Sequence, residues 1–529
     1  MKRVSSRLLK NILLVYLAIT VVLPIVALFS QIRGEHISSI VTSAQFLPML
    51  KNSLVSTVIA TVISVILAFA LAFVITRTDV RFKSVWMMLF TVPMLIPSIS
   101  HGMGLVLLFG DNGLLTNILG LRIDLYGYCG IVMGSVLYSF PVAFLMFFDS
   151  LQYEDYKTYE AADVLGMSKV RMFKTITLPS MRRTVVSAVL AVFTMVFTDY
   201  GVPLITGGTV MTLPVYMYRE VIGMMNFSGG AVIGVILLTP AIIAFLMDLK
   251  KSGSVGAVST VTKPFKISRN KPRDVAAYVF LSLSLLVMCL PIVAFACLSF
   301  VKQYPIDMTF TLDNVKKLIS GGIGMYFVNS LSVALLTALI GTCFSYFAAY
   351  CTARAGKTVP NQLLHFISML PLAIPGVVLG LSYVMTFKNV PLYGTIFMLV
   401  IVNIVHFFSS PYLMAYNSLS KFNPNLEDVG HTLGISRLRM LTAVYVPSTL
   451  YTIVEMYSYF FVNAMITISA VSFLANFRTT PLSLMIPQLE SQSFIEGTAI
   501  VSLLILALNL IEKGISFIVK RAIAKKETF

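Results

Sequence analysis

Long apolar runs alternate with short polar segments along the whole chain of 529 residues. A helix needs about 20 predominantly apolar residues to cross the hydrocarbon core of a bilayer. Runs near that length occur twelve times, at about residues 11–30, 53–76, 85–109, 128–149, 184–204, 229–248, 275–300, 328–351, 363–387, 391–415, 449–474 and 498–519. The pattern predicts an all-α polytopic membrane protein with about twelve transmembrane helices. The first run follows the basic segment MKRVSSRLLKN, as in a signal peptide, but it is long and no clear A-x-A cleavage site follows, so we expect a retained helix.

Basic side chains gather in alternate loops between the predicted helices. Cytoplasmic loops of membrane proteins are enriched in Lys and Arg, so Lys2, Arg3, Arg7 and Lys10 place the N-terminus inside. The same rule places the basic C-terminal segment 520–526 inside. This topology accounts for the formal net charge of +17 without a nucleic-acid partner.

The composition excludes a soluble enzyme with one buried core. Charged residues make up 12% of the chain and hydrophobic residues 57%, whereas globular domains carry roughly 25% charged residues. The five cysteines lie in apolar segments and none is in a C-x-x-C pair, which indicates neither a disulfide framework nor a zinc site. We also expect the many Met and Phe residues to pack between helices rather than to bind metal.

The chain divides into two similar halves joined by a polar, basic linker. The predicted domains are residues 1–250, the cytoplasmic linker 251–274 and residues 275–529. Each half repeats the same marker residues in the same order: Asn52, Ser53, Arg77, Pro93, Pro97 and Gly102 in the first, and Asn329, Ser330, Arg354, Pro371, Pro375 and Gly380 in the second. About six helices per half, an even number, predicts parallel repeats related by an axis along the membrane normal. We expect the Pro pairs to kink their helices, where they could serve as gates.

Each half also carries one polar segment, within residues 150–183 and 417–448. In the first, EAADVLGMSKVRMFKTITLP (160–179), Gly166 permits a turn that other residues resist. Ser168 can cap the next short helix, and Pro179 suits the first turn of the helix after that. The sequence predicts a helix–turn–helix on the cytoplasmic face, shaped to fit a groove on another protein.

This segment resembles the EAA loop of the permease subunits of ABC importers. The matching residues are Glu160, Ala161, Ala162, Gly166, Ile176, Leu178 and Pro179. The second copy has Asp428-Val429-Gly430 in place of the EAA triplet but keeps Gly434, Val444, Val446 and Pro447 at the same spacing. Its acid is Asp428 or Glu427. The resemblance implies the fold of a type I ABC importer permease, with both segments acting as coupling loops that dock into ATP-hydrolysing subunits.

The resemblance extends over most of the chain and implies a function. Two fused halves resemble the iron(III), thiamine and 2-aminoethylphosphonate group of importers, and FTDYGVPLITGG (197–208) is closest to its iron and phosphonate branch. The group implies a multi-pass permease of the bacterial cytoplasmic membrane. Its partners would be two copies of an ABC ATPase and an extracytoplasmic solute-binding protein. Ferric iron or a phosphonate is the expected solute; thiamine, another small solute, or an ion-driven secondary transporter remain alternatives.

The chain offers no chemistry of its own. Gly356-Lys357-Thr358 resembles the end of a phosphate loop, but Cys351 stands where the first Gly is required and no strand precedes it. No HExxH motif supports a membrane-embedded enzyme. We therefore predict a transport subunit with no catalytic residue, metal or cofactor, with ATP and Mg²⁺ bound by the partner ATPase.

Polar residues within apolar runs are candidates for the translocation path, because a charge in hydrocarbon costs at least about 2.5 kcal/mol. The candidates are Asp199, Glu455 and Asn463. Glu455 could instead reach water at the cytoplasmic end of its helix, and Asp199 could instead cap a helix end. His101 and His406 are expected to be packing residues.

Overall fold

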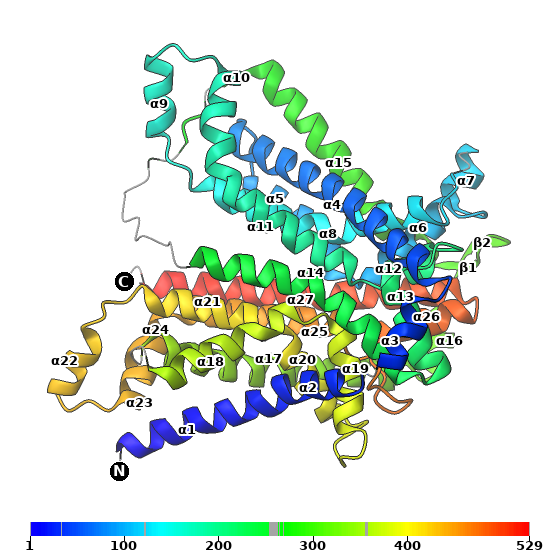
Figure 1. The fold of residues 1–529 in the computed structure, drawn as a ribbon. Helices are drawn as coiled ribbons and strands as arrows, with labels where there is room; N and C mark the ends of the chain where they lie inside the picture. The colour runs from blue at the N-terminus through cyan, green and yellow to red at the C-terminus, as the bar shows by residue number, and fades with distance from the viewer. Residues whose placement is uncertain are drawn as a thin grey trace. The chain divides into compact units, whose positions relative to one another are not determined.

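The computed structural model describes residues 2–32, 34–120, 123–252, 263, 265–267, 269–354 and 358–527. Over these residues helices joined by turns and loops make up most of the chain, and the strands form one two-stranded antiparallel sheet (Figure 1). Half of the predicted linker lies outside the described residues, as do Gly356 and Lys357 of the segment that resembles a phosphate loop.

The chain forms two compact units, and these cut across the two sequence halves. Unit 1 comprises Met1–Ser43, Met217–Ala241 and Ser299–Phe529, and unit 2 comprises Ala44–Tyr216 and Ile242–Leu298. The first helices of the N-terminal half therefore belong to unit 1, and the first helix of the C-terminal half belongs to unit 2. The predicted boundaries at residues 250 and 275 therefore separate the two sequence repeats, whereas the packing divides the chain elsewhere.

Unit 2 is built around α4 (Phe46–Arg77), α8 (Tyr128–Gln152) and α11 (Leu178–Phe197), which pack against one another. Phe140, Phe144 and Phe147 are fully buried between them. The other helices of this unit are α5 (Lys83–Thr91), η2 (Val92–Leu95), α6 (Ser98–Phe109), α7 (Leu114–Leu119), α9 (Lys157–Val164), α10 (Lys169–Met172), η3 (Phe173–Thr177), α12 (Gly201–Thr206) and α15 (Lys271–Leu298). Helix α15 lies so close to α6 that a Cβ at Gly104 would be 2.5 Å from Pro291 Cβ.

Unit 1 is built around α17 (Ile323–Ala353), which packs against α21 (Ser409–Ser420) and α25 (Leu450–Ile466). The N-terminal α1 (Lys2–Leu17), η1 (Ala18–Val22), α2 (Leu23–Ser30) and α3 (Gly34–Val41) belong here, and Tyr383 Oη donates to Thr20 O at 2.7 Å. The remaining elements are η4 (Arg219–Gly223), β1 (Val301–Gln303), β2 (Asp307–Phe310), α16 (Asp313–Ser320), α18 (Val359–Met369), η5 (Leu370–Ala373), α19 (Gly376–Phe387), α20 (Ile396–Phe407), α22 (Leu426–Thr432), α23 (Arg437–Met440), η6 (Leu441–Tyr445), α24 (Val446–Ser448), α26 (Leu482–Ser491) and α27 (Ile495–Glu527). Helices α13 (Leu213–Tyr218) and α14 (Phe227–Ser252) are each divided between the units.

Nine of the helices in the described residues are long and apolar enough to cross a membrane, and two bent pairs could supply two more. The bent pairs are Val359–Ala373 with Gly376–Phe387, at 112°, and Ile396–Phe407 with Ser409–Ser420, at 53°. The predicted span 85–109 is also broken, because η2, which contains Pro93, and the extended Ile96 interrupt it before Pro97. The predicted span 449–474 is too long, since α25 ends at Ile466 after 17 residues. The breaks expected at the Pro pairs are thus present.

The repeated Asn-Ser pair has a structural explanation in each unit. Asn52 Nδ2 donates to Met211 O at 3.0 Å, and Ser53 Oγ accepts from Leu213 N at 2.8 Å. In unit 1, Asn329 Nδ2 donates to Arg478 O at 2.8 Å and Ser330 Oγ accepts from Leu482 N at 2.6 Å. In both cases the pair satisfies a carbonyl of the segment before a second helix, α13 or α26, and the first N–H of that helix, as buried backbone requires.

Candidate functional site

The polar segment within residues 150–183, named here the first coupling loop after its predicted role, folds as the predicted helix–turn–helix. Helix α9 ends at Val164, and Gly166 follows in the left-handed conformation at φ +68°. Ser168 Oγ accepts from Arg171 N at 3.4 Å and caps α10. The chain continues through η3 into α11, which has Pro179 in its first turn. Figure 1 shows α9 and α10 beyond the ends of α8 and α11.

The second coupling loop repeats this geometry. Helix α22 ends at Thr432, Gly434 has φ +67°, and Ser436 Oγ accepts from Arg439 N at 3.3 Å. Helix α23 and η6 then lead to Pro447 in α24. A Cβ at Gly166 or Gly434 would meet no atom within 4 Å, so the left-handed backbone rather than crowding favours Gly there.

The inner face of each helix–turn–helix packs on a methionine of its second helix. In the first loop Ala162 and Met172 are buried together with Tyr159. In the second, a Cβ at Gly430 would lie 3.1 Å from Met440 Sδ. This close approach is a physical reason for one departure from the EAA triplet, the Gly at the position of its second alanine.

The outer face of each loop exposes apolar side chains at matching positions. Leu165 and Val170 are 78% and 66% exposed, and Leu433 and Leu438 are 69% and 63% exposed. Isolated apolar residues on a surface are ordinary, and what distinguishes these is that they recur at matching positions of the two loops.

An arginine at the end of a long helix anchors each loop. Arg77, the last residue of α4, forms an ion pair with Glu154 and donates to Leu151 O at 3.1 Å. Glu154 Oε1 also accepts from Ser180 Oγ at 2.6 Å. Both side chains of the ion pair are largely buried, so this contact fixes the start of the first loop to α4.

Arg354 plays the same part in unit 1 with a different acid. Its Nε donates to Glu427 Oε1 at 2.7 Å and its Nη2 to Glu427 Oε2 at 2.5 Å, which is a bidentate pair. Arg354 also donates to the carbonyl oxygens of Phe422 and Asn423, and Tyr445 Oη donates to Glu427 Oε1 at 2.5 Å. Glu427 is therefore the anchoring acid, whereas Asp428 is exposed at the position that matches Glu160.

A family model described as "Binding-protein-dependent transport system inner membrane component" matches residues 60–249 and again residues 341–525. The chain belongs to this family. It is a fused two-domain permease, which confirms the resemblance, the internal repeat and the multi-pass inner-membrane class inferred from the sequence.

Similar proteins of the family are ferric and thiamine permeases. The ferric transport system permease protein FbpB of Actinobacillus pleuropneumoniae is 24% identical over 502 residues, covering 89% of this chain and 72% of that protein. A putative ferric transport system permease protein, FbpB 1 of Haemophilus influenzae, is 24% identical and covers 89% and 78%. The thiamine transport system permease protein ThiP of Brucella suis is 26% identical over 39% of each chain.

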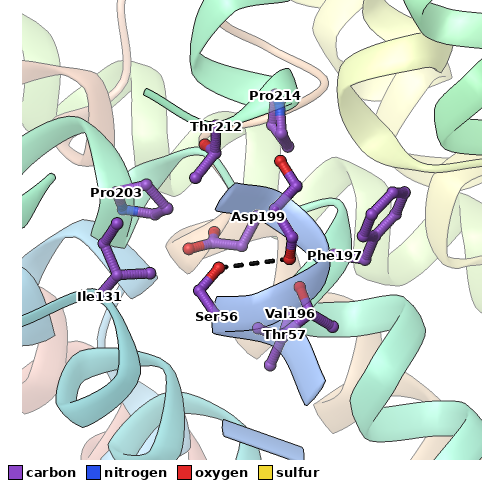
Figure 2. Close-up of a pocket in the computed structure, with 10 residues that line it drawn as sticks. Ser56, Thr57, Ile131, Val196, Phe197, Asp199, Pro203, Thr212 and Pro214 are labelled. Atoms are coloured by element: carbon purple, nitrogen blue, oxygen red, sulfur yellow. Dashed lines mark hydrogen bonds between the residues drawn. The ribbon is translucent and has the colours of Figure 1, made fainter. Parts of the chain in front are cut away.

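In this permease Asp199 lies between α11 and α12, where it joins two helix starts. Its Oδ1 accepts from Ser98 Oγ, in the first turn of α6, at 2.7 Å, and its Oδ2 accepts from Val202 N, in the first turn of α12, at 3.0 Å. These contacts match the alternative in which Asp199 caps a helix end. Asp199 also lines a small cavity with room for about one water molecule, together with residues that include Ser56, Thr57 and Thr212 (Figure 2).

Glu455 and Asn463 both lie on α25, and each has a local partner. Glu455 forms an ion pair with Lys520 of α27 and is 39% exposed. Asn463 Nδ2 donates to Tyr459 O of its own helix at 2.8 Å. Both contacts give these polar groups a partner within unit 1.

Two further charges within α27 did not figure among the expected path residues. Glu512 accepts from Ser458 Oγ at 2.8 Å and from Ser516 Oγ at 2.6 Å, and Lys513 Nζ donates to Ser458 Oγ at 2.8 Å. The pair sits inside the predicted span 498–519, so the cost of a charge in hydrocarbon was the signal that could have identified it. His101, expected to be a packing residue, is buried with Nε2 2.9 Å from Pro93 O.

Proposed function

We propose that this permease forms the translocation path of an ATP-driven importer for ferric iron. The observation that carries the proposal is the doubled helix–turn–helix, whose matching apolar tips suit two equivalent docking partners. In this proposal the partners are two copies of an ABC ATPase, which bind ATP and Mg²⁺, and both coupling loops and both termini face the cytoplasm.

The transport step follows from this arrangement. Closure of the two ATPase copies on ATP moves the coupling loops, and each loop moves the helices to which Arg77 or Arg354 anchors it. A binding protein delivers the solute on the opposite side, and hydrolysis restores the resting state. Asp199, Glu455 and Asn463 are the proposed polar residues of the path.

Ferric iron is favoured as the solute because ferric permeases match 89% of the chain. Thiamine is the second candidate, since a thiamine permease matches over 39% of the chain. The case for a phosphonate as the solute rests on the resemblance of residues 197–208 alone.

Uptake of radiolabelled ferric iron, thiamine and 2-aminoethylphosphonate into cells that express the permease with its co-encoded partners tests the solute. We expect iron uptake that vanadate blocks and an ionophore does not. The double variant Gly166→Asp and Gly434→Asp should abolish uptake and ATPase copurification.

Gly120 supplies a matched control for that variant. It also has a left-handed backbone, φ +65°, and open space around its Cβ position, but it follows α7 rather than a coupling loop. Gly120→Asp should leave uptake intact. Uptake that survives the double Gly variant, or that an ionophore alone abolishes, would reject the proposal.

A further inference from the structure

Described residues of the C-terminal half of the linker lie against the first coupling loop. Lys263 Nζ donates to both carboxylate oxygens of Glu160, at 2.5 and 2.7 Å. Lys263 O accepts from Tyr156 N at 3.1 Å, and Lys263 N donates to Asp155 Oδ1 at 3.2 Å. One residue of the linker thus engages α9 and the turn that precedes it through both backbone and side chain.

Phe265 fills an aromatic site on the same loop. Its ring is edge-on to Tyr156 and Tyr159, with centroids 4.9 and 5.0 Å away, and the Arg77 guanidinium lies 3.9 Å from its centroid. This is the geometry of edge-to-face aromatic packing and of a cation–π contact. Because Arg77 also holds Glu154, Phe265 covers the anchor of the loop as well as its first helix.

The contact continues from the loop toward α15. Arg269 Nε donates to Asp79 Oδ2 at 3.2 Å, and Asp79 N donates to Asp274 Oδ1 at 3.2 Å. The described linker residues therefore connect the first coupling loop with the start of α15 inside unit 2.

The second coupling loop has residues that cannot receive such a segment. Aligned on Gly166 and Gly434, the positions of Tyr156, Tyr159 and Glu160 are taken by Pro424, Glu427 and Asp428. Proline has no backbone N–H, so it cannot make the bond that Tyr156 donates to Lys263. The aromatic site is also lost, because Glu427 is committed to Arg354.

We infer that Lys263, Phe265 and Arg269 form a strap that positions the first coupling helix, and that this strap makes the two loops unequal. Its consequence for coupling rests on the proposed function, but its docking does not. Glu160, the acid of the EAA triplet, forms an ion pair with the protein's own Lys263, whereas Asp428 is left exposed for a partner.

Hydrogen exchange of the whole permease in nanodiscs tests the docking without any ATPase. Phe265→Ala should speed exchange of the Tyr156 and Lys263 amides on the order of tenfold, because the strap opens more often. Lys266→Gln is the matched control, since Lys266 is an exposed neighbour, and it should change nothing. Unchanged exchange at Tyr156 in Phe265→Ala, or equal acceleration in residues 424–432, would overturn the strap.

Swapping the charges of Lys263 and Glu160 tests whether their ion pair positions the loop. Lys263→Glu and Glu160→Lys should each reduce solute moved per ATP hydrolysed several-fold, whereas the double variant should restore this coupling and Lys263→Arg should retain it. Failure of the double variant to restore coupling would contradict positioning by this ion pair. If hydrogen exchange shows that the strap is docked but no ATPase copurifies with the wild-type permease, the proposed function fails while the docking of the strap stands.

Discussion

The sharpest test of the second coupling loop is the choice between its two neighbouring acids. Glu427 accepts two hydrogen bonds from Arg354 and one from Tyr445, and the Arg354 and Glu427 side chains are 5% and 23% exposed. Asp428 is the next residue and is exposed. The structure therefore predicts that Glu427→Gln destabilises the loop and that Asp428→Asn does not.

The size of the effect follows from the contacts that remain. Removing one partner of a buried ion pair costs about 3–5 kcal/mol. Glutamine keeps an oxygen that can accept from Tyr445, and Arg354 keeps its bonds to the carbonyls of Phe422 and Asn423. With Glu427 partly exposed, we expect the free energy of opening this loop to fall by about 1–3 kcal/mol.

Amide exchange over residues 426–445 is the assay, because it reports the opening of this loop alone. A change of that size accelerates exchange through loop opening about 5- to 150-fold. Asp428→Asn removes the same charge one residue away and serves as the control. Equal acceleration in both variants, or none in Glu427→Gln, would refute the assignment of Glu427 as the anchor.

The remaining predictions concern the turns and the candidate path. Gly166→Ala and Gly434→Ala should each weaken ATPase binding in a copurification titration, because a left-handed residue with a Cβ costs about 1–2 kcal/mol. Unchanged binding would show that the left-handed conformation at these positions does not matter for docking. Asp199→Asn should lower the thermal denaturation temperature, since an amide cannot accept on both atoms, and should also reduce uptake, because Asp199 is a proposed path residue; an unchanged temperature would contradict the capping contacts. Glu455→Gln should destabilise the protein by less than about 1 kcal/mol, because its pair with Lys520 is partly exposed, and a larger loss would contradict a simple surface pair.

Local backbone chemistry explains which parts of the candidate site the sequence predicted. Gly166 and Gly434 fix a left-handed turn, and Ser168 caps the helix that follows, so these features depend on residues only a few positions apart. The Pro pairs likewise break their helices as expected.

Long-range pairings could not be predicted in the same way. Nothing near Glu160 or Glu427 in the chain indicates Lys263 or Arg354 as its partner, because each pair forms only when distant segments meet. The span 449–474 was overestimated for a related reason. The apolar residues after Ile466 are non-helical but still buried, so hydropathy alone cannot mark the end of α25.

Each compact unit contains helices from both sequence halves, and this has a consequence for splitting the gene between the repeats. A cut between the repeats would yield one fragment carrying α1 and α2, which complete unit 1, and another carrying α15, which completes unit 2. Each fragment alone would lack helices of its own unit and would carry helices that pack in the other unit. The two products should regain activity only when made together in one cell, so the fused gene guarantees equal numbers of two mutually dependent parts.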